Sequence, residues 1–224
     1  MVSINETLDQ ALNLDAADSW SLGEKSFAEI VGLLKDLDPK RILEFGSGVS
    51  SVRFALRLPD CEITSVEHDR FYADKTESLK NTYHASNLKL IYSPLNSRWF
   101  GLTPYRTYSF KPEPIEFDGI IIDGPPGAVK GGREACLYFV YQHLKIGGFV
   151  FLDDYERSEE QRAIRHWLET YADSFEFFEI QGRHRVAVLR KMQHVKPKMM
   201  TAARIGHNFR CQFGKFIAGK KGCL

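Results

Sequence analysis

The segment from Arg41 to Ala55, with the sequence RILEFGSGVSSVRFA, constrains the fold of this 224-residue chain more than any other segment. Its first residues are mainly apolar and predict a buried strand, and the residues from Ser50 onward predict a helix. Gly46, Ser47 and Gly48 form the turn between them, where glycine lets the backbone bend sharply and approach a ligand closely. Free N–H groups at a helix start favour polar or anionic ligands. Although Gly-x-Gly also occurs in unrelated loops, a strand, a glycine turn and a helix in this order predict a nucleotide-type binding corner.

Two acidic residues distinguish this corner from a dinucleotide-binding one. Glu44 stands one residue before the end of the first predicted strand, where dinucleotide-binding folds more often have a glycine or an apolar residue. Glu67 follows a second predicted strand, 62–66, and a carboxylate at that position can accept hydrogen bonds from both hydroxyls of a ribose. Ser51 occupies the place of the third glycine of the dinucleotide fingerprint. The motifs LEFGSG and VEHD therefore resemble the motifs that bind S-adenosylmethionine (SAM) in class I methyltransferases more closely than they resemble GxGxxG.

The composition is that of an ordinary globular protein, with 43% hydrophobic and 26% charged residues. Residues 1–10 lack the apolar core of a signal peptide, and no apolar run approaches the length of a membrane span. The cysteines do not have the spacing of a metal site, so we expect reduced thiols in a cytoplasmic protein. They are Cys61, Cys136, Cys211 and Cys223.

The charged residues are distributed unevenly along the chain. A net charge of −10 for residues 1–179, with 19 basic and 29 acidic residues, is balanced by +11 for the last 45 residues. Within this basic tail, apolar residues recur at helical spacing, namely Ala202, Ile205, Phe209, Phe213 and Phe216. Such a helix can dock on the body, associate with a second subunit or lie on an anionic membrane surface. We do not expect nucleic acid as a partner, because no recognisable nucleic-acid-binding module accompanies the charge.

Apolar runs separated by glycine or proline turns divide the middle of the chain into alternating strands and helices. The predicted strands are 41–45, 62–66, 88–92, 117–122, 149–152, 175–180 and 185–189. This pattern predicts an α/β fold with a seven-stranded, mostly parallel, doubly wound sheet and an antiparallel terminal strand. We divide the chain into an N-terminal helical extension (1–38), a SAM-binding methyltransferase domain (39–191) and a basic, helical C-terminal tail (192–224).

The segment 93–116 is rich in aromatic residues and proline and is predicted to be a long loop. Loops of this length are uncommon in compact domains unless they are functional. A lid packed over the core and a loop that grips the substrate are both compatible with this composition.

Four motifs follow one another at predicted strand ends: LEFGSG, VEHD, IDGPPG and GGFVFLDD. Together they resemble the motif series of class I SAM-dependent methyltransferases over roughly residues 21–191. The resemblance implies that Glu44 fixes the methionine amino group of SAM, that Glu67 holds the ribose and that Ser93 flanks the adenine. The implied cofactor site as a whole comprises Glu44, Gly46, Ser47, Gly48, Ser50, Glu67, His68, Ser93 and Asp123. The alternative is a fold that binds a nicotinamide dinucleotide.

Asp123, Asp153 and Asp154 follow two predicted strands that we expect to be neighbours, so their carboxylates should converge at one edge of the sheet. Three acids in one cleft repel one another unless a cation or a proton intervenes. An all-oxygen set suits Mg²⁺, and the pattern resembles metal-dependent O-methyltransferases of the catechol and antibiotic-sugar types. A metal there would hold two substrate oxygens and lower the pKa of the one to be methylated. The alternative is that Asp153 or Asp154 caps the next helix and that Asp123 fixes its turn.

Asp123 and Lys130 are the candidate general bases. Catechol-type enzymes have a lysine just past the first acid, where this chain has the sequence GPPG from Gly124 to Gly127. Lys130 follows in the same loop, and Asp123 is the simpler candidate. Arg133, at a predicted helix start beside the cleft, is expected either to hold an anionic substrate group or to cap the helix in solvent.

These features predict a SAM-dependent methyltransferase that acts on an oxygen of a small polar molecule such as a sugar or polyol, with Mg²⁺ as a candidate second cofactor. SAM supplies the electrophile, so the protein mainly aligns the acceptor and removes its proton. One alternative is a SAM-binding module whose basic tail anchors it to a membrane or a partner. The other is a nicotinamide-dinucleotide-binding protein.

Overall fold

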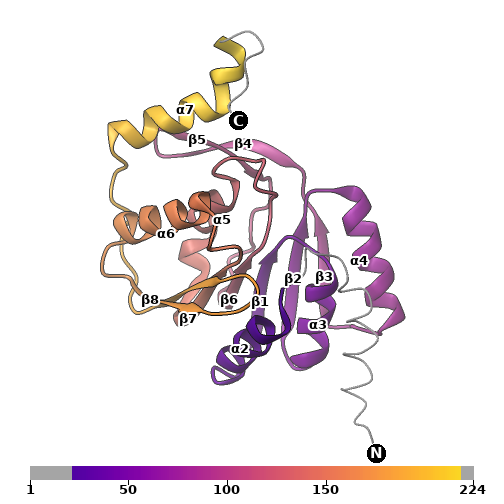
Figure 1. Ribbon diagram of the computed structural model, residues 1–224. Helices are drawn as coiled ribbons and strands as arrows, with labels where there is room; N and C mark the ends of the chain where they lie inside the picture. The colour runs from indigo at the N-terminus through magenta and orange to yellow at the C-terminus, as the bar shows by residue number, and fades with distance from the viewer. Residues whose placement is uncertain (1–21, 218–224) are drawn as a thin grey trace, which may run out of the picture.

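The computed structural model describes residues 22–217, apart from the side chains of residue 203 and residues 212–217. Seven strands form the central sheet (Figure 1). Their order is β3-β2-β1-β6-β7-β9-β8, and β9 runs in the direction opposite to the other six. The strands are β1 (Arg41–Phe45), β2 (Glu62–Glu67), β3 (Leu88–Tyr92), β6 (Phe117–Ile122), β7 (Leu144–Leu152), β8 (Phe175–Ile180) and β9 (Val186–Lys191). The predicted seven-stranded, mostly parallel sheet with an antiparallel terminal strand is confirmed.

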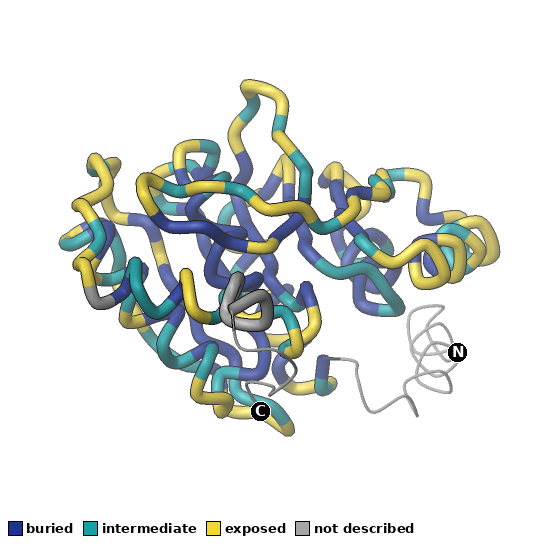
Figure 2. The backbone as a smooth tube through the Cα atoms, turned by 90° about the horizontal axis from the view of Figure 1, so that it is seen from above, coloured by how far each residue is buried: buried dark blue, intermediate teal, exposed yellow. Residues whose placement is uncertain are grey.

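Helices cover both faces of this sheet, as expected for a doubly wound fold. One buried cluster joins the sheet to α2 and α3, and a second joins it to α5 and α6. The backbone is accordingly most buried in the middle of the molecule (Figure 2). The helices are α2 (Glu24–Lys35), α3 (Val49–Arg57), α4 (Arg70–Thr82), α5 (Gly132–Val140), the 3-10 turn η1 (Tyr141–His143), α6 (Ser158–Thr170) and α7 (Ala202–Ile217).

Helix α2, which the sequence placed in an N-terminal extension, packs directly on the sheet. Phe27, Ile30 and Leu34 are buried on one face of α2. A Cβ at Gly119 of β6 would lie only 2.7 Å from Cδ2 of Leu34, so glycine at this position allows the close approach. The first 21 residues of the predicted extension lie outside the described residues, as does Cys223.

The prediction of a long loop over residues 93–116 is wrong for its central part. Strands β4 (Leu95–Phe100) and β5 (Thr103–Tyr108) form a separate antiparallel hairpin. Pro104 lies inside β5 opposite Trp99, and proline within a run argues against a strand at the level of sequence. Tyr105 and Tyr108 are buried against α5 as part of the core, so the hairpin is packed as a lid.

The carboxyl ends of the central strands meet at one edge because the strands are paired in register there. Phe45 at the end of β1 pairs with Val66 of β2 and with Ile122 of β6, and Ile122 pairs with Leu152 of β7. This register brings the residues that follow each strand side by side at the edge, namely Gly46, Glu67, Asp123 and Asp153.

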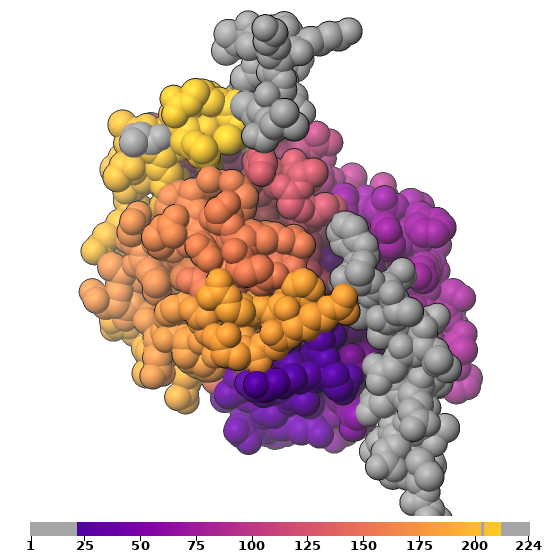
Figure 3. Space-filling model, viewed as in Figure 1, coloured from indigo at the N-terminus to yellow at the C-terminus, as the bar shows by residue number. Residues whose placement is uncertain are grey.

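The tail helix α7 lies against α6 and the hairpin (Figure 3). Its body-facing residues are the buried Arg204 and Asn208, whereas Phe209 of the predicted apolar stripe is partly exposed and contacts Trp99. The first part of the tail therefore docks on the body through polar residues. The side chains of Phe213 and Phe216 lie outside the described residues. No helix in the described part of the chain has the length and apolarity that a membrane crossing needs.

Candidate functional site

The glycine turn after β1 is held tightly on one side and is open on the other. Gly46 has φ of +95°, and a Cβ there would lie 2.9 Å from the backbone N of Gly124, so only glycine suits the position. A Cβ at Gly48 would meet no described atom within 4 Å. The turn thus closes against the end of β6 and leaves room for a ligand beside Gly48 at the start of α3.

Glu67 at the end of β2 fastens this turn. Its Oε2 accepts the backbone N–H of Ser47 at 2.8 Å, and its Oε1 accepts the N–H groups of His68 and Asp69 at 2.6 and 2.8 Å. Burial alone would raise the pKa of Glu67, but hydrogen bonds from the His68 side chain and these backbone groups outweigh it, so the pKa is lowered. The carboxylate is ionised, and its Oε2, which accepts only the N–H of Ser47, keeps about one lone-pair site for a ribose hydroxyl.

Glu44 is an acid at the edge whose hydrogen bonds are incomplete. It is buried, its Oε1 accepts a long hydrogen bond of 3.4 Å from Ser50, and its Oε2 has no partner. Burial raises the pKa of Glu44 to about 7, against the opposing effect of nearby serine hydroxyls. A carboxylate in this position gains strongly from a cationic ligand group.

Two further hydroxyl groups at the edge are buried without a partner. The Oγ of Ser93, directly after β3, has no hydrogen bond, although its backbone N–H donates to the carbonyl of Glu67 at 2.7 Å. The hydroxyl of Tyr108 is also unpartnered, and a Cβ at Gly124 would lie 2.2 Å from it. His68 lies beside Tyr108, with the two rings edge-on and its Nδ1 2.9 Å from Glu67. Buried hydroxyls of this kind require a polar partner that the described part of the chain does not supply.

The three aspartates converge as predicted, and a guanidinium group lies among them. Their carboxylate oxygens lie within 4.8 Å of one another. Arg133 places Nη1 2.9 Å from Oδ2 of Asp154 and Nη2 3.3 Å from Oδ1 of Asp123. Arg157 also contacts Asp154, at 2.7 Å, whereas Oδ1 of Asp153 has no partner. The buried Arg133 therefore offsets part of the negative charge of the cluster, and its ion pairs match neither a substrate clamp nor a solvated helix cap.

Asp123 and Lys130, the candidate bases, differ sharply in their surroundings. Asp123 lies at the edge with its side chain 24% exposed. Burial and the neighbouring carboxylate of Asp153 raise the pKa of Asp123 well above its ordinary value, against the opposing effect of Arg133. Lys130 is exposed in the loop before α5. The structure thus places Asp123, and not Lys130, among the groups of the cluster.

Sequence reasoning missed the role of two residues here. Tyr108 was one of several aromatic residues in an apparent loop, and nothing in the sequence singles it out. Arg133 was noticed at its helix start, but its ion pairs depend on the approach of α5 to the ends of β6 and β7. The three converging acids were themselves a signal for this role of Arg133, since such a set requires a nearby cation.

No protein-family model matches this chain, and no curated protein matches it significantly. Solved structures do match. The O-methyltransferase TomG from Streptomyces achromogenes, crystallised with SAM, superposes with a TM-score of 0.61 over 84% of this chain and 89% of its own, at 16% sequence identity. The chain has the class I methyltransferase fold.

Two other matches show how widely the chemistry varies on this fold. An O-methyltransferase from Bacillus cereus in complex with S-adenosylhomocysteine (SAH) matches with a TM-score of 0.60 and 15% identity, over 84% of this chain and 90% of its own. A precorrin-6y C5,15-methyltransferase from Geobacter metallireducens matches with a TM-score of 0.55 and 16% identity, over 78% and 91%. Similarity at this level fixes the fold, while the acceptor has to be argued from the site.

Proposed function

We propose that this protein is a SAM-dependent methyltransferase that transfers a methyl group to an oxygen of a small polar molecule. The observation that carries the proposal is Glu44, a buried carboxylate with an unpartnered oxygen beside the open side of the glycine turn. The ammonium group of the methionine part of SAM is the kind of cation that such a carboxylate requires. A dinucleotide would instead bring its anionic pyrophosphate to this turn, where Glu44 would repel it.

The remaining orphan groups fit the other parts of SAM. The last acceptor site of Glu67 suits a ribose hydroxyl, and the free hydroxyl of Ser93 lies at the next strand end, where it can meet the adenine. Tyr108 can donate its hydroxyl to the cofactor at the junction of Gly46 and Gly124. When bound, SAM supplies an electrophilic methyl group, and the residues of the chain orient the acceptor and remove its proton.

Asp123 is the proposed general base. Its side chain is partly accessible at the edge, and its raised pKa makes the carboxylate a stronger base than that of an ordinary aspartate. The unpartnered Oδ1 of Asp153 can accept a second hydrogen bond from the acceptor. Two adjacent carboxylates of this kind suit a molecule with neighbouring hydroxyls, such as a sugar or polyol.

The cofactor prediction is tested by isothermal titration calorimetry. We expect SAM and SAH to bind and NAD to give no heat. Glu67→Ala should weaken SAH binding by about 1.5–3 kcal/mol, because the ribose loses a charge-assisted partner and Ser47 loses its anchor. Glu62→Ala, at the exposed opposite end of β2, is the matched control and should leave affinity unchanged. NAD binding without SAH binding would refute the proposal.

Magnesium assistance remains a prediction, and the donor set suits it only in part. Asp123 and Asp153 offer carboxylate oxygens, but Oδ2 of Asp154 is already shared by Arg133 and Arg157. We propose that Arg133 supplies the positive charge that a metal would otherwise bring. The SAH complex should then show no Mn²⁺ binding in the millimolar range by water proton relaxation. Mn²⁺ binding that Asp153→Asn abolishes would instead establish the metal site.

A further inference from the structure

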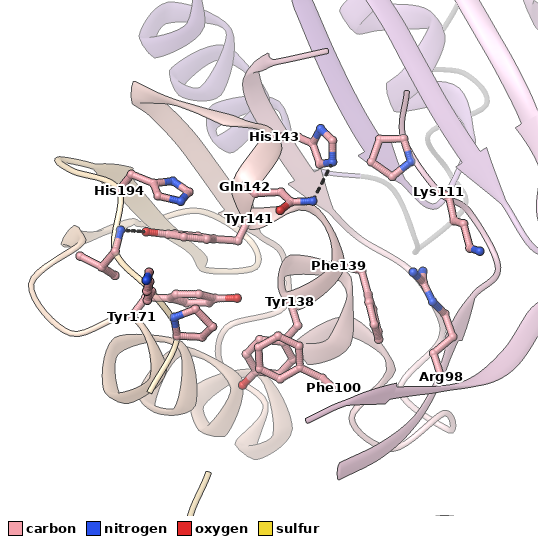
Figure 4. A pocket seen from close by; sticks show the side chains of 14 residues that line it. Arg98, Phe100, Lys111, Tyr138, Phe139, Tyr141, Gln142, His143, Tyr171 and His194 are labelled. Carbon is pink, nitrogen blue, oxygen red and sulfur yellow. Dashed lines mark hydrogen bonds between the residues drawn. The ribbon is translucent and has the colours of Figure 1, made fainter. Parts of the chain in front are cut away.

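A cavity of about 460 Å³ lies away from the carboxyl edge, between the β4–β5 hairpin, the end of α5 and the chain after β9 (Figure 4). His143, the last residue of η1 before β7, and Pro112, in the segment before β6, line it. The cavity therefore flanks the amino ends of these strands, whereas Asp123 and Asp153 follow their carboxyl ends. The length of β6, roughly 17 Å at 3.3 Å per residue, separates the two levels of the sheet.

The charged groups around the cavity are positive. Arg98 and Lys111 lie together on one side of it (Figure 4), Lys196 also lines it, and none of the described lining residues is Asp or Glu. Nη1 of Arg98 donates to the carbonyl groups of Tyr108 and Phe110 at 3.0 and 2.8 Å. Carbonyl partners orient the guanidinium without neutralising it, so its charge remains available to an anion.

The buried Lys191, which lies behind residues that line the cavity, adds to this positive potential. Nζ of Lys191 donates to the carbonyl groups of Tyr141 and Leu144 at 3.0 and 2.6 Å and lies 3.3 Å from Nδ1 of His194. Burial lowers the pKa of Lys191 to about 8, partly offset by Glu116, so the ammonium is mostly charged at pH 7. A cation therefore lies directly behind His194 and Tyr141, which line the cavity.

Aromatic rings form much of the rest of the lining. Tyr141 is stacked between Tyr171, at 3.8 Å between ring centroids, and His194, at 5.3 Å. On the opposite side the guanidinium of Arg98 lies 3.7 Å over the ring of Phe139, and Phe139 also lines the cavity. A space bounded by aromatic rings and by separate cations matches a ligand with a flat ring and a multiply charged anionic group.

We propose that this cavity is a second ligand site, specific for a phosphate monoester that carries a flat ring, and that it is independent of the cofactor edge. Arg98 and Lys111 contact the phosphate, Lys196 adds positive charge to the cavity, and the aromatic walls contain the ring. A dianion fits the separate cations better than a single carboxylate does, because each lysine acts as an independent point charge.

The test uses the full chain saturated with SAH, so that the cofactor edge is closed, and uridine 5′-monophosphate (UMP) as the probe in calorimetry. UMP should bind, and uridine and inorganic phosphate should each bind about tenfold more weakly, because each lacks half of the recognised groups. Added salt should weaken UMP binding. Lys111→Gln and Lys196→Gln should each lower UMP affinity several-fold and leave SAH affinity unchanged.

Lys89→Gln, an exposed lysine on β3 outside the cavity, is the matched control and should have no effect. Absence of UMP binding at millimolar concentration would overturn the proposal. So would UMP affinity that is the same in the Lys111, Lys196 and Lys89 variants, or UMP binding that occurs only without SAH, which would place the nucleotide at the cofactor edge. A chain that binds UMP as expected but not SAM would refute the proposed function and leave the second site standing.

Discussion

Arg204→Met is expected to lower the free energy of unfolding by about 3–5 kcal/mol, since it removes one partner of a buried ion pair. Nη2 of Arg204 lies 3.0 Å from Oε1 of Glu134, and both side chains are almost fully buried. The same oxygen accepts the hydroxyls of Tyr105 and Tyr138 at 3.0 and 2.9 Å. Without the guanidinium, Glu134 would keep its negative charge in the core with only neutral donors and the nearby His166.

Urea unfolding measures this effect, and Arg210→Met is its matched control. Arg210 is exposed on the same helix, so its replacement should change the free energy of unfolding by no more than about 0.5 kcal/mol. Adding Glu134→Gln to Arg204→Met should restore part of the loss, because the unpaired charge is then gone. Equal effects of the two arginine variants would contradict the docking of α7 through Arg204.

The central sheet was predictable because its signals are local. Ile42, Leu43 and Phe45 form an apolar run that must be buried. Asp69 stands directly before α4 and caps this helix by accepting the N–H of Phe71. Strand ends in a parallel sheet share one edge, so the meeting of Glu67 with the glycine turn also followed from the order of elements.

The features that the sequence did not reveal depend on contacts between distant segments. The β4–β5 hairpin contains Pro104 and lacks a regular alternation, and its burial depends on α5 and α7. Helix α7 shows an apolar stripe through Ile205 and Phe209, yet among its described side chains the buried ones are Arg204 and Asn208. The acidic partner of Arg204 lies 70 residues earlier in the chain, so over residues 202–211 the hydrophobic period did not mark the residues that dock.

The acidic cluster illustrates the same limit within the site. The sequence placed Asp123, Asp153 and Asp154 together correctly and therefore raised the question of a cation. The identity of that cation depends on how far the side chain of Arg133 reaches from α5, which the spacing of residues does not determine. Prediction of such a site improves when every basic residue near a converging acidic set is considered as its counter-ion.

Glu44→Gln is expected to make the protein more stable and at the same time unable to bind SAM tightly. The pKa of Glu44 is about 7 in the folded protein and 4.5 in the unfolded chain. Between pH 4.5 and pH 7 the carboxyl group is therefore protonated in the folded protein and ionised in the unfolded chain. The free energy of unfolding falls as the pH rises through this range, by about 3 kcal/mol in total. Glutamine carries no charge, so the variant should be more stable than the parent by about this amount at pH 8 and nearly equal to it at pH 4.5.

The affinity for the cofactor should rise with pH, whereas stability falls, because the ammonium group of SAM requires the ionised carboxylate of Glu44. The parent should bind SAH more tightly at pH 8 than at pH 6 and release about half a proton per site at pH 7, measurable by calorimetry in buffers of different ionisation enthalpy. Glu44→Gln should lose about 2–3 kcal/mol of affinity and all of this proton release. Glu62→Gln on the adjacent strand should change neither property. A Glu44→Gln protein that binds SAH with parental affinity would show that the carboxylate faces no cation, and the observation that carries the proposed function would then fail.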